Sequence, residues 1–339
     1  MKKLIFFTLS LLIASWQLQA GEPCDITGCD GCGRSSAWYM NTEGIFFSAI
    51  NDGASQSFQL QDVNQNIALT PAASSFDADE FTLTPRITLG RTGACGWGVQ
   101  ARYWQMNVDA GQGYAGPFVT PASTPSISVI NGNAGLEAYT VDLEATRCLC
   151  LFGQDFLGTF GVRHGAIEHS NSQAAFAVSS GGDNYLLSAF NERSFHGTGI
   201  TYSLSGVRPL RCRNFSLYGG TRFSHLFGDN ESTASTSVFL GSPAGTAYAT
   251  NSAIGSDNDG LFIAETTAGL QWAHGIRRCN ALCFARIGFE YQYWNADDAN
   301  ATASSFAAVG GSSLAAATAT AGELETHFVG LGLSTGFSW

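Results

Sequence analysis

The chain has 339 residues, including 40 Gly, 24 Phe, 10 Tyr and 7 Trp, and only 13% of its residues are charged. Typical soluble domains carry roughly 25% charged residues, so much of the surface must be covered by something other than charge, and lipid is the natural candidate. The net charge of −11 argues against a nucleic-acid partner.

The amino terminus has the pattern of a secretory signal peptide. Lys2 and Lys3 precede the apolar run "LIFFTLSLLIA", and "LQA" offers small residues suited to cleavage after Ala20. The apolar run is only about half of the roughly 20 residues that a retained transmembrane helix needs. We therefore expect residues 1–20 to be removed. The two lysines are the only ones in the chain, so the remainder has 14 Arg against 27 acidic residues, a net charge of −13.

Ten segments alternate between apolar and small or polar residues with a period of two, which is typical of β-strands with one apolar face. In chain order, the outward apolar rows are predicted to run over Trp38–Phe46, Phe81–Leu89, Trp97–Tyr103, Tyr139–Ala145, Phe156–Val162, Ile200–Leu204, Phe215–Phe223, Phe262–Trp272, Ala285–Tyr293 and Val329–Trp339.

The connections between these segments alternate strictly in length. Those near 93–96, 149–155, 209–213 and 275–281 are short, and those at 51–79, 109–134, 170–193, 229–259 and 297–322 are long. A transmembrane β-barrel has short periplasmic turns and long external loops, whereas a Greek-key sandwich mixes connection types. The prediction is an all-β, up-and-down antiparallel transmembrane barrel of about 10 strands over 38–339, after a Cys-rich periplasmic segment over 21–37.

The strand count is open between 8 and 12, because "SQSFQLQ" and "QNIALTP" could pair as an extra hairpin. Tyr and Trp belong at the lipid headgroup level, and eight of them lie near predicted strand ends. They are Trp97, Tyr103, Trp104, Trp272, Tyr291, Tyr293, Trp294 and Trp339.

The opposite face of the strands carries five basic and five acidic residues. They are Glu43, Arg86, Arg102, Asp142, Glu144, Arg163, Arg222, Glu265, Arg286 and Glu290. Facing a lumen, these charges are either a constriction that filters solutes or a network of ion pairs that closes a small barrel. A barrel of ten strands is near the small end of the range of strand numbers that leave an open channel. Eight glycines on the same face would remove bulk and leave a narrow pore: Gly90, Gly98, Gly161, Gly220, Gly288, Gly330, Gly332 and Gly336.

The two sides of the predicted membrane differ in charge. The long connections hold acidic residues such as Asp109, Glu168, Glu192 and Glu231, whereas the short turns hold Arg91, Arg147, Arg208, Arg211, Arg213, Arg277 and Arg278. An acidic mouth would concentrate cations, which predicts a weak cation preference, or would bind divalent ions that bridge to lipopolysaccharide. Alternatively, acidic loops simply aid solubility.

The nine cysteines lie at the short turns or in the N-terminal segment: Cys24, Cys29, Cys32, Cys95, Cys148, Cys150, Cys212, Cys279 and Cys283. Disulfides are expected in an oxidising compartment, and an odd count leaves at least one thiol free or paired with another chain. We consider both stapling of neighbouring turns and cross-links between copies. No His has zinc-finger spacing to "CDITGCDGC", so no metal or other cofactor is expected.

Few residues suggest catalysis. His164 and His169 with Asp183, or His225 with Asp229, could form a base and its orienting acid. The chain lacks a nucleophile elbow or zinc-protease motif. We expect a non-enzyme. The sequence favours a porin-like outer-membrane barrel that passes small hydrophilic solutes or ions with a weak cation preference, and the main rival is a structural or adhesive barrel with a closed lumen.

Several blocks resemble the Legionella-type major outer membrane protein family, which is also common in planctomycetes. They include "PRITLGRTGACGWGVQARYWQMN", "LEAYTVDLEATR", "LYGGTRFSHLFG", "FARIGFEYQYW" and the closing strand. The resemblance implies a porin-like barrel in the outer membrane of a Gram-negative-type bacterium, in contact with its lipid and lipopolysaccharide, and homo-oligomers with disulfide-linked assembly. The terminal Phe337 and Trp339 resemble the C-terminal signal that the barrel assembly machinery reads.

Overall fold

The computed structural model describes residues 37–62, 65–69, 81–93, 96–117, 127–151, 154–178, 183–210, 214–276, 281–296, 299–309 and 313–339. The signal peptide and most of the predicted Cys-rich segment lie outside these residues. Twelve strands occupy this part of the chain. They are β1 (Ala37–Asp62), β2 (Gln65–Leu69), β3 (Thr82–Thr92), β4 (Trp97–Pro117), β5 (Ile127–Leu151), β6 (Gln154–Val178), β7 (Asn184–Pro209), β8 (Phe215–Ser242), β9 (Gly245–Ile276), β10 (Ala281–Ala296), β11 (Ala301–Val309) and β12 (Ser313–Ser338).

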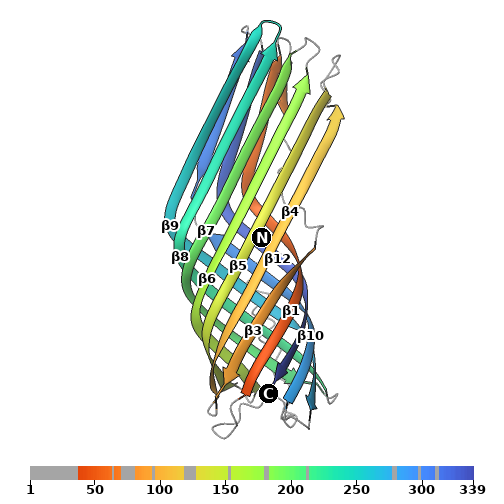
Figure 1. The fold of residues 1–339 in the computed structure, drawn as a ribbon, viewed down its shortest axis with the longest axis vertical. Helices are drawn as coiled ribbons and strands as arrows, with labels where there is room; N and C mark the ends of the chain where they lie inside the picture. The colour runs from red at the N-terminus through yellow and green to blue at the C-terminus, as the bar shows by residue number, and fades with distance from the viewer. Residues whose placement is uncertain are drawn as a thin grey trace.

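Ten of these strands close into an antiparallel barrel (Figure 1). Each pairs with its neighbour in chain order, and β12 pairs with both β10 and β1. At the closing seam, the main chains of Trp38 and Trp339 exchange two hydrogen bonds of 2.8 and 2.9 Å. The predicted ten-strand transmembrane barrel is confirmed, and closure leaves no free edge in its lower part.

The predicted hairpin near residue 60 also exists. β2 pairs with the end of β1, from Phe58 opposite Leu69 to Asp62 opposite Gln65. It lengthens one wall and does not add a strand to the closed ring, because β2 pairs with β1 alone.

The predicted outward rows face outward. Leu143, Phe160, Val162 and Leu331 are between 48% and 67% exposed, and alternation puts the residues between them inside. Among the described residues no helix is long and apolar enough to cross a membrane. The apolar outer face is the lipid-facing band of a transmembrane barrel.

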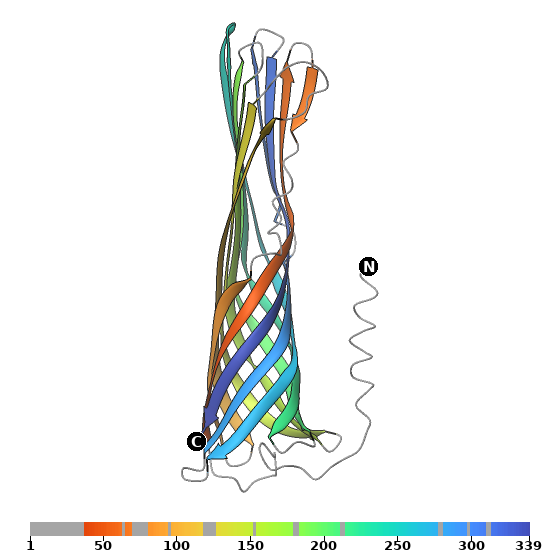
Figure 2. The same cartoon turned by 90° about the vertical axis from the view of Figure 1, so that its right-hand side faces the viewer.

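The predicted long loops are instead mostly strand. β8 and β9 run through the predicted 229–259 loop and are joined at Pro243 and Ala244, followed by Gly245, whose φ of 143° favours glycine. A membrane-crossing strand needs about 9 to 11 residues, and β9 has 32. The strands therefore rise well beyond the apolar band, and Figures 1 and 2 show them continuing above the closed lower barrel.

Above the band the ring divides into two sheets, which together we call the stalk. β10 ends its pairing at Ala296, and the upper parts of β12 and β1 pair with β11 and β2. This sheet lies against the upper parts of β7, β8 and β9, since β11 approaches β8 and β9 and β12 approaches β7 and β8. Thr236 and Ser305, from opposite sheets, join their hydroxyls at 2.7 Å.

Candidate functional site

The candidate site is the lumen of the lower barrel, where the structure places all ten predicted inner charges. They project from β1, β3, β4, β5, β6, β8, β9 and β10. The ion-paired side chains are at most 11% exposed, except Glu43 at 20%. Four positive and five negative groups thus share one water-poor layer.

One group of charges is centred on Arg86 of β3. Its guanidinium donates to Glu43 on the neighbouring strand at 3.0 Å and to Glu290 of β10 at 2.8 Å. Between β3 and β10 lie β1 and β12 in the ring. The pair with Glu290 therefore crosses part of the lumen and does not simply follow the wall.

The larger group is centred on Asp142 and Glu265. Arg163 donates two hydrogen bonds of 2.6 and 2.8 Å to the carboxylate of Asp142, in the bidentate geometry that suits guanidinium and carboxylate. Arg163 also reaches Glu265 at 2.6 Å, and Arg102 reaches the other Glu265 oxygen at 2.7 Å. Arg222 pairs with Glu144. This group joins β4, β5, β6, β8 and β9.

Arg286 differs from the other four arginines. It donates to Gln271 at 2.7 Å, and its guanidinium lies 5.1 Å from the ring centre of Tyr218 and 4.6 Å from that of Phe284. Such cation–π contacts stabilise a charge inside an apolar wall. Arg286, Tyr218 and Tyr39 are partly exposed, so the lumen below the charged layer is open to water at the end with the short turns.

The inward glycines do not widen a pore. A Cβ at Gly90 would overlap the ring of Tyr39, and one at Gly336 would overlap the ring of Phe284. A Cβ at Gly288 would overlap the Tyr218 hydroxyl. Aromatic side chains from neighbouring strands lie over these glycines, so the bulk that glycine removes is replaced by rings.

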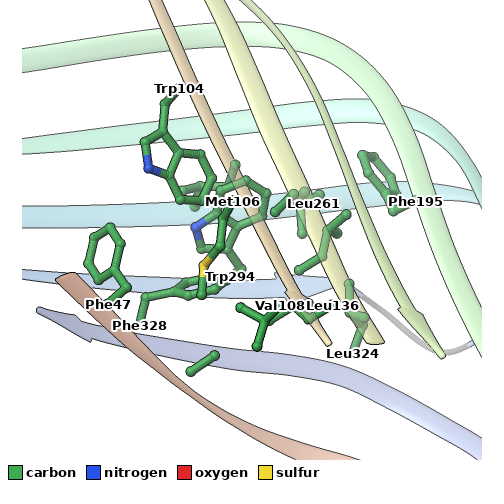
Figure 3. Close-up of a cluster of buried hydrophobic side chains, with 14 of the residues drawn as sticks. Phe47, Trp104, Met106, Val108, Leu136, Phe195, Leu261, Trp294, Leu324 and Phe328 are labelled. Atoms are coloured by element: carbon green, nitrogen blue, oxygen red, sulfur yellow. The ribbon is translucent and has the colours of Figure 1, made fainter. Parts of the chain in front are cut away.

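An apolar layer fills the lumen above the charges (Figure 3). Its centre is Trp104, Trp294, Phe47 and Phe328, each at most 1% exposed, with ring centroids 5.7 to 6.1 Å apart. The prediction that Trp104 and Trp294 lie at the lipid headgroups is therefore wrong. Trp104 follows the outward Tyr103, and Trp294 follows the outward Tyr293. Because side chains alternate along a strand, both tryptophans face inward. The doublets at 46–47, 103–104 and 293–294 were the sequence signal for this layer.

A third layer closes the stalk. Its inner face is made of small side chains in contact across the two sheets, mainly alanines of β11 and β12 against Ala234, Val238 and Leu240 of β8. Arg193 of β7 reaches across the same space and donates to the main-chain carbonyl of Gly322. Small residues let the sheets approach closely, so this part of the interior is also packed.

The candidate catalytic histidines do not assemble a site. His164 faces outward and bonds Thr198 at 2.9 Å, whereas His169 lies inside the stalk, and its burial lowers its pKa to about 4. His225 and Asp229 share the outer face of β8, but residues four apart on a strand are about 13 Å apart. No group of three metal-binding side chains occurs among the described residues.

Three acidic residues of the predicted mouth lie on the outer wall of the stalk. Glu168, Glu192 and Glu231 come from adjacent strands, and partial burial together with the two neighbouring carboxylates raises the pKa of Glu192. They lie side by side on one part of the outer wall, just above the lipid-facing band, and do not line an opening of the lumen. Arg91 and Arg147, at the other end, lie over the rings of Trp38 and Trp97.

The structure describes two cysteine side chains, Cys148 and Cys283, and both are free thiols. The other seven lie outside the described residues or have undescribed side chains, so cross-linking stays a prediction. Phe337, near the end of β12, and Trp339, directly after it, are 53% and 55% exposed.

No protein-family model matches the chain, and no curated protein matches it. Solved structures similar to it include the outer membrane protease OmpT from Escherichia coli, with 11% identity, 92% of this chain and 99% of that chain covered, and a TM-score of 0.33. A Pseudomonas aeruginosa FadL homologue has 9% identity, 90% coverage of each chain and a TM-score of 0.24. The outer membrane channel DcaP of Acinetobacter baumannii has 7% identity, 88% and 97% coverage, and a TM-score of 0.11. At these values no activity transfers to this chain.

Proposed function

We propose that the chain is an integral outer-membrane β-barrel with a closed lumen, which serves as a structural or adhesive surface protein by holding a rigid stalk above the membrane. The lipid-facing band, the even strand number and the short turns at one end support this location. Membership of the Legionella-type family is part of the proposal and rests on the sequence blocks alone.

The observation that carries the proposal is the ion pair between Arg102 and Glu265. β4 and β9 are five strands apart in either direction around the ten-strand ring, and Nη2 of Arg102 lies 2.7 Å from Oε2 of Glu265. A direct contact between opposite walls leaves no passage at that point. The aromatic layer and the packed stalk lie above it in series.

A narrow pore with a weak cation preference is the second candidate. The water-accessible space below the charged layer, beside Tyr39 and Tyr218, favours it. Passage would require the cross-lumen ion pairs and the aromatic layer to separate together. The buried charged groups would then lose partners in a medium where an unpaired charge is costly, so we rank this function below the closed barrel.

Solute release from vesicles tests the proposal. The purified protein is inserted into lipid vesicles loaded with a small neutral sugar or with a monovalent salt, and release is compared with that from protein-free vesicles. The closed barrel predicts that vesicles with the protein release each solute at the same rate as protein-free vesicles. Faster release with the protein, above all of the cation, would support the pore instead.

A further inference from the structure

The outer wall of the stalk carries an apolar row that lipid cannot cover. Phe176 of β6 pairs with Leu186 of β7, Leu186 with Phe239 of β8, and Phe239 with Tyr248 of β9. We call these four residues the stalk row. Their side chains face outward and are 42%, 51%, 38% and 69% exposed. They therefore form one continuous line across four neighbouring strands.

The stalk row lies far from the lipid-facing band. Leu186 is separated along β7 by fourteen positions from Ile200, an exposed member of the apolar band, which is about 45 Å at roughly 3.3 Å per residue. Single exposed apolar residues need no explanation, but a contiguous row outside the membrane marks an interaction site.

The surroundings of the row are uncharged. Residues 170–178, 184–191, 232–242 and 245–256 contain no Asp, Glu, Lys or Arg. The chain after residue 20 nevertheless has a net charge of −13, so two copies repel one another where their charged surfaces meet. This wall lets two copies approach without that repulsion.

The position of the row on a side wall, and not at the tip, selects the partner. Copies inserted in one membrane share the same orientation and height, so a lateral neighbour presents the same row at the same level. A two-fold axis along the membrane normal then brings the row against itself, as in an isologous contact. We propose that the stalk row is the surface through which two copies of this chain associate side by side.

The size of the surface fits a membrane-confined contact. Four strands about 4.8 Å apart and some eight residues long cover roughly 500 Å² per copy, or about 1,000 Å² in total, at the lower limit for a specific interface. Confinement to one membrane raises the effective concentration of the partner, so a contact that is weak in solution can persist there. This inference does not depend on whether the lumen conducts.

Energy transfer between labelled copies tests the association. Because residues 21–339 contain no Lys, an amine-reactive dye labels the amino terminus alone, and donor and acceptor copies are mixed in vesicles under reducing conditions, which remove disulfide cross-links. We expect transfer above that of randomly placed copies for the unmodified chain. The double variant Leu186→Ser, Phe239→Ser should fall to the random level.

The matched control is Phe306→Ser. Phe306 is 58% exposed on β11, in the other sheet of the stalk, so its loss removes an apolar side chain of the same class without touching the row. Transfer should stay at the unmodified level. Random transfer for the unmodified chain, or undiminished transfer in the double variant, would overturn the proposal. A heat-dependent shift in gel mobility, compared across the variants, shows that each is folded.

Discussion

Arg102 on β4 and Glu265 on β9 hold opposite walls of the barrel together, with 2.7 Å between Nη2 and Oε2. Glu265 also accepts from Arg163 of β6 at 2.6 Å, so one buried carboxylate connects three strands. The contact is both a structural tie and a block across the lumen. Substitutions of Glu265 can therefore be tested in two ways, by the free energy of unfolding and by the passage of solutes through the lumen.

Glu265→Gln keeps the shape of the side chain but removes the charge that two guanidinium groups share. Removing one partner from a buried ion pair typically costs about 3 to 5 kcal/mol, and we expect a loss of that size in the free energy of unfolding. Urea titration of the protein in lipid vesicles measures it. Glu231→Gln, on the exposed outer wall, is the control and should stay within about 0.5 kcal/mol. Equal losses for the two variants would contradict the network.

His169 should make stability depend on pH. Its folded pKa of about 4 lies below the ordinary value of 6.5 because the ring is buried. Below pH 6.5 the unfolded chain binds a proton at this histidine, whereas the buried ring of the folded chain stays neutral. The contribution of His169 to the free energy of unfolding is therefore complete above pH 6.5 and is lost as the pH falls towards 4. Through this one group, the free energy of unfolding changes by at most about 1.4 kcal/mol per pH unit.

The variant His169→Gln isolates this group from the many carboxylates that also titrate. Urea midpoints at pH 7 and pH 5 should differ more for the unmodified chain than for the variant. If both chains lose the same stability between these two values, the buried ring does not titrate as expected.

Deletion of Phe337 to Trp339 should leave the chain in the periplasm. The deletion removes both main-chain bonds between Trp339 and Trp38, at the end of the closing ladder between β1 and β12, and the aromatic end that we expect the assembly machinery to read. Membrane fractionation checks the outcome. Phe306→Ala, which removes an aromatic side chain elsewhere, should insert normally. Normal insertion of the truncated chain would refute the role of this terminus.

Cysteine cross-linking is tested on electrophoresis gels with and without reducing agent. Cys148 and Cys283 have no disulfide partner within the chain, so each is available for a link to a second copy. A cross-linked band of the unmodified chain should therefore disappear in the double variant Cys148→Ser, Cys283→Ser. Loss of a cross-linked band in this variant would assign the link to those two residues. A monomer band in both conditions for the unmodified chain would remove the cross-linking idea altogether.

The sequence predicted the lower barrel well because contrast between the two faces is strong there. Leucines and aromatics face lipid while arginines and carboxylates face inward, so alternation locates both the strands and the inner charges. The contrast disappears in the stalk. In β12, for example, Ala315, Ala317 and Ala319 face inward while Ala316, Thr318 and Thr320 face outward, and small residues on both faces look like a loop.

The closure of the lumen could not be predicted from the same pattern. Alternation shows that Arg102 and Glu265 face inward, but whether they meet depends on the number of strands and on their tilt. Likewise, Gly90 removes bulk only if no neighbour fills the space, and the ring of Tyr39 fills it. These are contacts between distant segments, which a local pattern does not contain.

Conductance across a planar lipid bilayer tests the closed lumen most directly. The purified protein is inserted, and current is recorded over a range of voltages and salt concentrations, with insertion checked separately by protease protection of the barrel. The cross-lumen ion pair of Arg102 and Glu265 predicts no single-channel steps under any of these conditions. Reproducible steps of constant size that favour cations would contradict it and would establish the narrow pore in its place.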